Sequence, residues 1–316
     1  MTVDAATAFA ARARSARNGR AREPGSAKPT WRLADMLPET LEWIESLGSE
    51  GGAGISGVPT GLADLDALTN GLQPGSLLVV GASPAVGKST LLLDFCRSAT
   101  LRNSLPSALF SLDMTRRELS MRLLSAEARV PMHVLRGGLM SDDDRTRLAR
   151  RMADITDAPL YVNDTGLLTV QALCDEATRL VRDHGVSLIA VDYLQLIMLG
   201  LRGETREREI SEITRRLKAL ALDLAVPVVV AAQLNRDPEC SADKQPILAD
   251  LRESDAITQT ADLVILLHRE DAYERESPRA GEADLIVAQH RHGPTAIITV
   301  AFQGHYSRFV DMLARP

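Results

Sequence analysis

The sequence predicts an α/β fold in which a mainly parallel, twisted β-sheet is covered by helices on both faces. Three observations support this prediction. Short apolar runs alternate with helical patterns from Gly57 onward, which is the pattern of βαβ units. A glycine-rich loop joins one of these runs to a helix. Polar residues end three of the runs, as they do at the ligand crevice of open α/β sheets.

Length and composition are those of an ordinary globular protein. The 316 residues have room for one large α/β domain and an extension, and 45% of them are hydrophobic. The net charge of −6 does not favour nucleic-acid binding by the whole molecule. Any such binding therefore has to be local, or has to be created by assembly.

Cysteine use and hydropathy indicate a bacterial cytoplasmic protein. Cys96, Cys174 and Cys240 lack metal-ligand spacing, so we interpret them as thiols in a reducing compartment. No apolar stretch of 18 residues occurs, and we therefore expect no membrane span and no membrane partner. The many Arg and Ala residues favour a bacterial source.

Two segments precede the predicted domain. Residues 1–30 are rich in Ala and Arg; a transit peptide has this composition, but we favour a disordered basic arm. Residues 31–56 contain a predicted linker helix over Leu33–Leu47 and then a Gly/Ser-rich break. The apolar face of this helix has to pack either on its own domain or on a neighbouring subunit.

Residues 57–316 form the predicted domain. The helical patterns include Val170–His184, which Gly185 closes, and Glu207–Leu224. We expect the last two apolar runs to form an antiparallel hairpin at one edge of the sheet. The predicted strands are Leu77–Val80, Ala108–Leu112, Leu160–Val162, Leu188–Asp192, Val226–Ala232, Leu263–Leu267, Leu285–Ala288 and Ala296–Phe302.

The segment GASPAVGKST at residues 81–90 is the phosphate cradle of a P-loop nucleotidase. Backbone N–H groups of such a loop and the N-terminus of the next helix both attract a polyphosphate. Lys88 is predicted to reach the β and γ phosphates, and the Ser89 hydroxyl to bind Mg2+. The strict pattern has Gly where this chain has Ala82. The predicted nucleotide-binding residues are Ala82, Ser83, Pro84, Ala85, Val86, Gly87, Lys88, Ser89 and Thr90.

Polar residues at three other strand ends complete the predicted site. Asp192 ends an apolar run, as the metal-binding Walker B aspartate of P-loop proteins does. Asp113 follows a second run and is suited to polarise the attacking water. Gln233 ends a third run, where its amide is suited to sense the γ-phosphate.

Four longer motifs point to one family. They are GVPTGLADLD at 57–66, DYLQL at 192–196, EISEITRRLKAL at 209–220 and DLRES at 250–254. Together with the linker helix they resemble the C-terminal, RecA-like motor domain of DnaB-type replicative helicases, from about Trp31 to Met312. The family's loop commonly starts with Ala, as here.

The resemblance implies a homo-hexameric ring that hydrolyses ATP with Mg2+ at subunit interfaces and translocates on single-stranded DNA. It implies that Arg291 is an arginine finger supplied to the neighbouring subunit. A helicase loader or other replication proteins are the further partners that it implies. It implies DNA contacts on two loops, with Arg202 and Arg206 on one and Arg252, Glu253 and Ser254 on the other. For Arg202 and Arg206 the alternative is a solvated helix start.

Three substitutions depart from the family pattern. Asp113 stands in place of Glu, which shortens the predicted base by roughly 1.5 Å. Gln289 replaces a Lys two residues before the finger, and Asp255 replaces a Gly on a DNA loop. Because misplacing a catalytic group by about 1 Å costs on the order of a hundredfold, we expect slow hydrolysis with ordinary ATP affinity.

The departures leave alternatives open. Only about 30 residues precede the linker helix, so we expect no N-terminal collar domain. One alternative is a degenerate ring protein that binds ATP and DNA with little hydrolysis. Another is a different RecA-like ATPase, of the RadA or circadian-clock type, although the DYLQL and DLRES motifs disfavour it.

Overall fold

The computed structural model describes residues 30–49, 55–200, 205–234, 245–251, 254–274 and 276–312. The predicted basic arm, apart from Thr30, lies outside the described residues. Among the described helices, none is long and apolar enough to cross a membrane.

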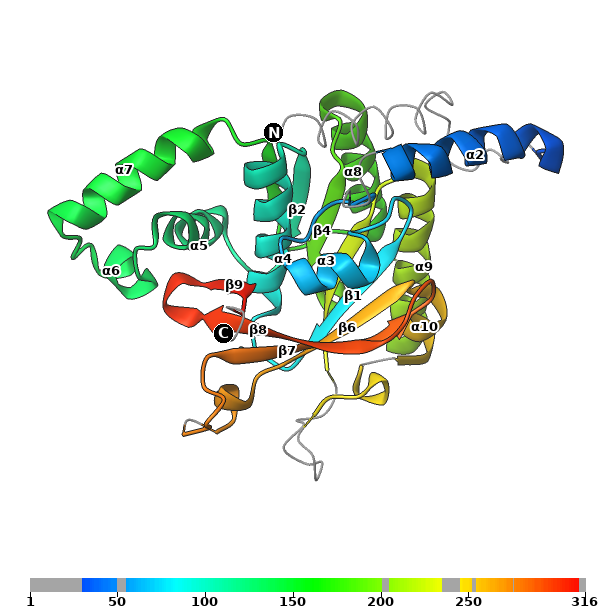
Figure 1. The fold of residues 1–316 in the computed structure, drawn as a ribbon. Coiled ribbons are helices and arrows are strands. Elements are labelled where there is room, and N and C mark those ends of the chain that lie inside the picture. The colour runs from blue at the N-terminus through cyan, green and yellow to red at the C-terminus, as the bar shows by residue number, and fades with distance from the viewer. Residues whose placement is uncertain are drawn as a thin grey trace.

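One nine-stranded sheet forms the centre of the described part of the chain, in the order β3-β2-β4-β5-β1-β6-β7-β8-β9 (Figure 1). The six strands from β3 to β6 run parallel, and β7, β8 and β9 continue the sheet antiparallel. The strands are β1 Leu77–Ala82, β2 Ser107–Ser111, β3 Leu160–Asn163, β4 Leu188–Asp192, β5 Val228–Gln233, β6 Leu263–His268, β7 Glu282–His290, β8 Ala296–Gln303 and β9 Arg308–Asp311.

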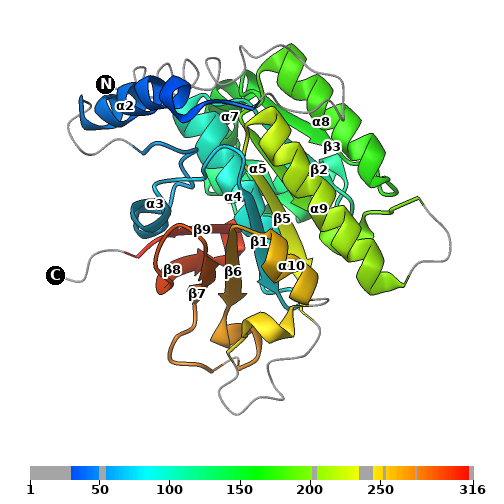
Figure 2. The same cartoon turned by 90° about the vertical axis from the view of Figure 1, so that its right-hand side faces the viewer.

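Helices cover both faces of the sheet (Figure 2). On one face, α3 and α4 enclose a core with β1, β6 and β7, and on the other, α8, α9 and α10 enclose a second core. The predicted α/β architecture is therefore confirmed. The helices are α2 Leu33–Ser49, α3 Ala63–Thr69, α4 Lys88–Arg97, α5 Arg116–Ala128, α6 Met132–Gly137, α7 Asp142–Thr156, α8 Val170–His184, α9 Arg206–Leu224 and α10 Ser254–Thr260.

Local sequence explains the two long helices behind the sheet. In α8 the Thr169 hydroxyl accepts a hydrogen bond from the backbone N–H of Ala172, and Gly185 ends the helix in the left-handed conformation. Buried side chains recur at helical spacing in both helices; they are Val170, Leu173, Ala177 and Leu180 in α8 and Ile210, Ile213, Leu217 and Leu220 in α9.

The prediction of an antiparallel hairpin is correct in its strand pairing, but the hairpin does not lie at the edge of the sheet. Strands β7 and β8 are antiparallel neighbours, yet β9 pairs with β8 and takes the edge of the sheet. The four residues RFVD of β9 mix charged and apolar side chains, so they show no strand periodicity. Helices α5 to α7, which form a lobe beside the sheet (Figure 1), were not predicted either.

Helix α2 extends away from the sheet (Figure 1). Its apolar side chains lie in solvent: Leu33 is 70% exposed, Leu41 57% and Ile44 52%. These side chains are therefore not buried against the described residues of their own domain, which was one of the two expectations.

Candidate nucleotide-binding site

The predicted phosphate cradle lies between β1 and α4. Strand β1 ends at Ala82, and α4 begins at Lys88. Gly87 has φ +120, and a Cβ there would stand 3.0 Å from Cζ of Phe309. Only glycine fits this turn without strain. The first turn of α4 therefore points its N–H groups at the loop, which suits a phosphate.

Lys88 is held against this loop. Its Nζ donates hydrogen bonds to the backbone oxygens of Ala82 at 3.0 Å and Ser83 at 3.1 Å. Burial lowers the pKa of Lys88, while the negative charges of Asp192 and Asp113 act in the opposite direction. The ammonium group and both carboxylates are thus close enough to interact at one end of the sheet.

The carboxyl group of Asp192 lies beside the Ser89 side chain at the same end of the sheet. Asp192 is 2% exposed. Burial is the main cause that raises the pKa of its carboxyl group, while a hydrogen bond with the Ser89 side chain lowers this pKa. Oδ2 of Asp192 is buried without a hydrogen-bond partner among the described residues. An unpartnered carboxylate oxygen beside a hydroxyl fits Mg2+, which takes one or two protein oxygens and completes its shell with phosphate and water.

Asp113 and Gln233 flank this pair. Ser111 pairs with Asp192 across β2 and β4, so Asp113, which is exposed, lies just beyond the same sheet edge. Gln233 pairs with Ala82 across β5 and β1. Its backbone N–H donates to Oε1 of Gln195 at 3.1 Å, and Nε2 of Gln195 donates to the Gln233 oxygen at 3.3 Å. Gln195 therefore holds the end of β5 in place.

Two arginines at this site were missed by sequence reasoning. Nη1 of Arg122, on α5, donates to Oγ1 of Thr90 at 3.3 Å, and burial lowers its pKa. Nη1 of Arg269 donates to the Val86 oxygen at 3.1 Å, and its guanidinium lies 3.7 Å from the centre of the Phe302 ring. Arg269 directly follows β6, so the strand-end rule could have found it; no sequence signal marks Arg122.

Arg291 lies at the opposite end of the sheet. His290 at the end of β7 pairs with Leu263 at the start of β6, whereas the cradle follows the end of β1. The length of the six-residue β1 separates these ends by about 20 Å. Arg291 is 39% exposed, and its backbone N–H donates to the Asp262 oxygen at 2.9 Å. It therefore cannot reach the cradle of its own chain.

A family model for the DnaB-like helicase C terminal domain matches residues 57–311. This chain belongs to that family. The resemblance stated from the motifs is confirmed. The matched residues include the loop in which Ala82 stands in place of the Gly of the strict pattern.

Curated relatives agree with this assignment. The replicative DNA helicase DnaB of Leifsonia xyli is 51% identical over 280 residues, which are 89% of this chain and 61% of that protein. The DnaB of Geobacillus stearothermophilus is 37% identical over 284 residues, which are 90% of this chain and 62% of that one. The chain thus spans about 60% of the length of these relatives.

Solved structures support the RecA-like fold. One solved ATPase domain aligns with a TM-score of 0.85 at 29% identity, covering 90% of this chain and 100% of that chain. A DnaB-like replicative helicase, solved in a study of its interactions with primase, aligns with a TM-score of 0.81 at 27% identity; the match covers 98% of this chain and 76% of that chain. A KaiC-like protein from Pyrococcus horikoshii, at 15% identity and a TM-score of 0.56, shares the fold alone.

Of the residues predicted to contact DNA, the structure describes the side chain of Arg206 alone. Arg202, Arg252 and Glu253 lie outside the described residues, and only the backbone of Ser254 is described. Arg206 donates to the Gln195 oxygen at 2.6 Å and to Glu209 at 2.7 Å. Its side chain is therefore held by its own subunit, and its role in DNA binding stays a prediction.

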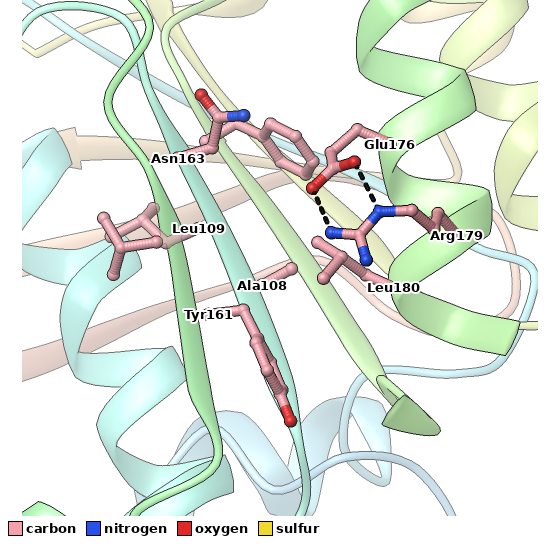
Figure 3. A pocket seen from close by; sticks show the side chains of 9 residues that line it. Ala108, Leu109, Tyr161, Asn163, Glu176, Arg179 and Leu180 are labelled. Atoms are coloured by element: carbon pink, nitrogen blue, oxygen red, sulfur yellow. Dashed lines mark hydrogen bonds and ion pairs between the residues drawn. The ribbon is translucent and has the colours of Figure 1, made fainter. Parts of the chain in front are cut away.

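A separate cavity of about 170 Å³ lies between β2, β3 and α8 (Figure 3). Ala108, Phe110 and Leu180 contribute to its lining, and a 2.7 Å ion pair joins Glu176 to Arg179 beside it. The cavity is at the β3 edge of the sheet and includes no residue of the cradle, so it is not the nucleotide site.

Proposed function

We propose that this protein is an ATP-dependent DNA helicase or translocase that acts on single-stranded DNA during replication, as a homo-hexameric ring. One observation carries this proposal. The phosphate and metal residues converge at one end of the sheet, while Arg291 lies at the other end. A complete site then needs two subunits, and a ring supplies such a site at every interface. The DnaB name of the relatives, each longer than this chain, supports the same activity.

In this proposal the loop 82–90 binds the phosphates of ATP. Its backbone N–H groups and the Lys88 ammonium contact the β and γ phosphates. Ser89 and Asp192 hold Mg2+, which neutralises charge on the phosphate oxygens. Arg269 and Phe302 brace the loop from the side through Val86.

Hydrolysis proceeds by attack of water on the γ-phosphorus. The new P–O bond forms as the bond to the ADP oxygen breaks. Asp113 orients the water and accepts its proton. Gln233, whose backbone Gln195 holds, contacts the γ-phosphate. Arg291 of one subunit stabilises the negative charge that develops in the site of the next.

Assembly follows from the exposed face of α2. Leu33, Leu41 and Ile44 are left uncovered by the described residues of their own chain, and contiguous exposed apolar residues mark an interaction surface. We assign this face to a neighbouring subunit. With a net charge of −6, DNA binding has to be local or created by assembly, and in this proposal basic residues of several subunits gather around the DNA. A helicase loader or other replication proteins, and a cytoplasmic location, are part of the same proposal.

Steady-state ATPase assays with and without single-stranded DNA test the proposal. We expect hydrolysis that DNA stimulates and that Lys88→Ala abolishes, because the loop loses its charge on the β and γ phosphates. Wild-type turnover in Lys88→Ala would contradict the site. ATP and DNA binding without hydrolysis would instead support a degenerate ring protein. A hydrolysis rate that single-stranded DNA does not change would support another RecA-like ATPase.

A further inference from the structure

The side chain of Gln289, near the end of β7, is directed at helix α10. Its Nε2 donates to the backbone oxygen of Thr258 at 2.9 Å and to that of Ala261 at 2.8 Å. The last carbonyls of a helix have no partner within the helix. Thr258 lies in the last turn of α10 and Ala261 directly follows the helix. The two hydrogens of one amide group match these two acceptors, so Gln289 caps this helix end.

Arg291 binds the same helix end. Positions 289 and 291 are two residues apart in sequence, and the Arg291 guanidinium donates to the Gln259 oxygen. Its Nη1 lies 3.7 Å from Oδ1 of Asp262. Oδ2 of Asp262 in turn accepts hydrogen bonds from Lys218 at 2.7 Å and from the backbone N–H of Leu77 at 2.8 Å. The position of the guanidinium therefore depends on where α10 ends.

Helix α10 belongs to the crossover that joins the two ends of the sheet. Before the helix, Leu251 forms a bridge with Leu234, and a Cβ at Gly81 would stand 2.7 Å from its Cδ2. After the helix, Asp262 leads into β6 at the finger end. The crossover thus leads from the cradle end of the sheet to the residues that contact Arg291.

We propose that Gln289 is a positioning residue: it clamps the end of α10 and thereby holds Arg291 in the geometry that serves the neighbouring site. The proposal rests on the function proposed above for Arg291. It also assigns a role to the Gln that replaces the family's Lys. In this chain the side chain at 289 is a neutral double donor to its own subunit.

Three variants separate clamping from charge and from packing. Gln289→Met keeps the volume and removes both donors, Gln289→Glu offers only acceptors to two carbonyl oxygens, and Gln289→Lys keeps donors. Gln171→Met on the exposed surface of α8 is the matched control, since it also removes a side-chain hydrogen bond. Each full-length variant is compared by amide hydrogen exchange over 254–262 and by DNA-stimulated ATPase kinetics.

We expect α10 amides to exchange about tenfold faster in Gln289→Met, because two hydrogen bonds are lost. We expect kcat to fall about tenfold with the KM for ATP and the particle mass unchanged. Gln289→Glu loses more. Gln289→Lys keeps the exchange protection and has a kcat no lower than that of the wild type, and Gln171→Met resembles the wild type.

Wild-type exchange in Gln289→Met would show that no clamp exists and would overturn the inference whatever the ATPase does. Faster exchange with unchanged kcat would show a clamp that does not position Arg291, and would overturn it too. If the wild type and Lys88→Ala are equally inactive, the proposed function fails, and the role of the clamp fails with it.

Discussion

The two ends of the central sheet differ in how complete they are. At the cradle end, Lys88, Ser89 and Asp192 already interact with one another or with the loop of their own chain. At the finger end, Arg291 contacts backbone and carboxylate groups that hold it in place. One end brings together the groups that the proposed function assigns to phosphate and Mg2+, and the other holds a partly exposed cation. Under the proposed function, a subunit needs its neighbours for hydrolysis but not for binding nucleotide.

Removing the finger gives the largest expected effect. Arg291→Ala is expected to lower kcat by a factor of about 10^3–10^5 with ATP affinity retained. The arginine would stabilise only the negative charge that develops in the transition state, so ATP binding does not depend on it. Mixing Arg291→Ala with Lys88→Ala subunits should restore part of the activity, since some interfaces then combine an intact cradle with an intact finger. Steady-state turnover of the mixture measures this. No restoration at any ratio would show that the two ends do not act between subunits.

Lengthening the predicted base changes the cradle end alone. Asp113→Glu is expected to raise kcat, by as much as about a hundredfold, because the carboxylate moves closer to the attacking water. ATP binding should stay nearly unchanged, as titration with a fluorescent nucleotide would record. A lower kcat would mean that the site is tuned to Asp and that the shorter residue is no defect.

Blocking assembly is expected to leave the cradle end of each subunit without the finger end of its neighbour. Leu41→Glu places a charge on the exposed apolar face of α2. The substitution should leave the fold of the subunit intact, because surface changes usually alter stability by less than about 0.5 kcal/mol. We expect a smaller particle in light scattering and about tenfold less turnover per subunit with nucleotide binding retained. A hexamer of unchanged mass would rule out this face as the subunit contact.

Acidification weakens the metal site gradually. Burial raises the pKa of Asp192 above the ordinary 3.8, so the carboxyl group takes up its proton at a higher pH than an exposed Asp does. A protonated carboxyl does not bind Mg2+. The Mg2+ concentration for half-maximal turnover should therefore rise several-fold as the pH falls towards this raised pKa, and metal titrations at a series of pH values would detect it. A flat profile would place Asp192 outside the metal site.

Local pattern alone determined much of this protein. The parallel strands, the helices α8 and α9 and the cradle at 82–90 follow from periodicity, caps and loop composition, which are properties of short segments. The gathering of Lys88, Asp192 and Gln233 follows from the rule that parallel strands end at one edge. The same strand-end rule extends to Arg269 and could have found it.

Only the tertiary structure decided the rest. Arg122 reaches Thr90, and Gln289 reaches α10, through contacts between elements that no sequence periodicity records. The place of β9 and the separation of Arg291 from its own cradle depend on the pairing of antiparallel strands. Such pairing is set by which surfaces pack together across the whole domain. The sequence predicts the finger, and the folded sheet shows that the cradle of its own chain is out of its reach.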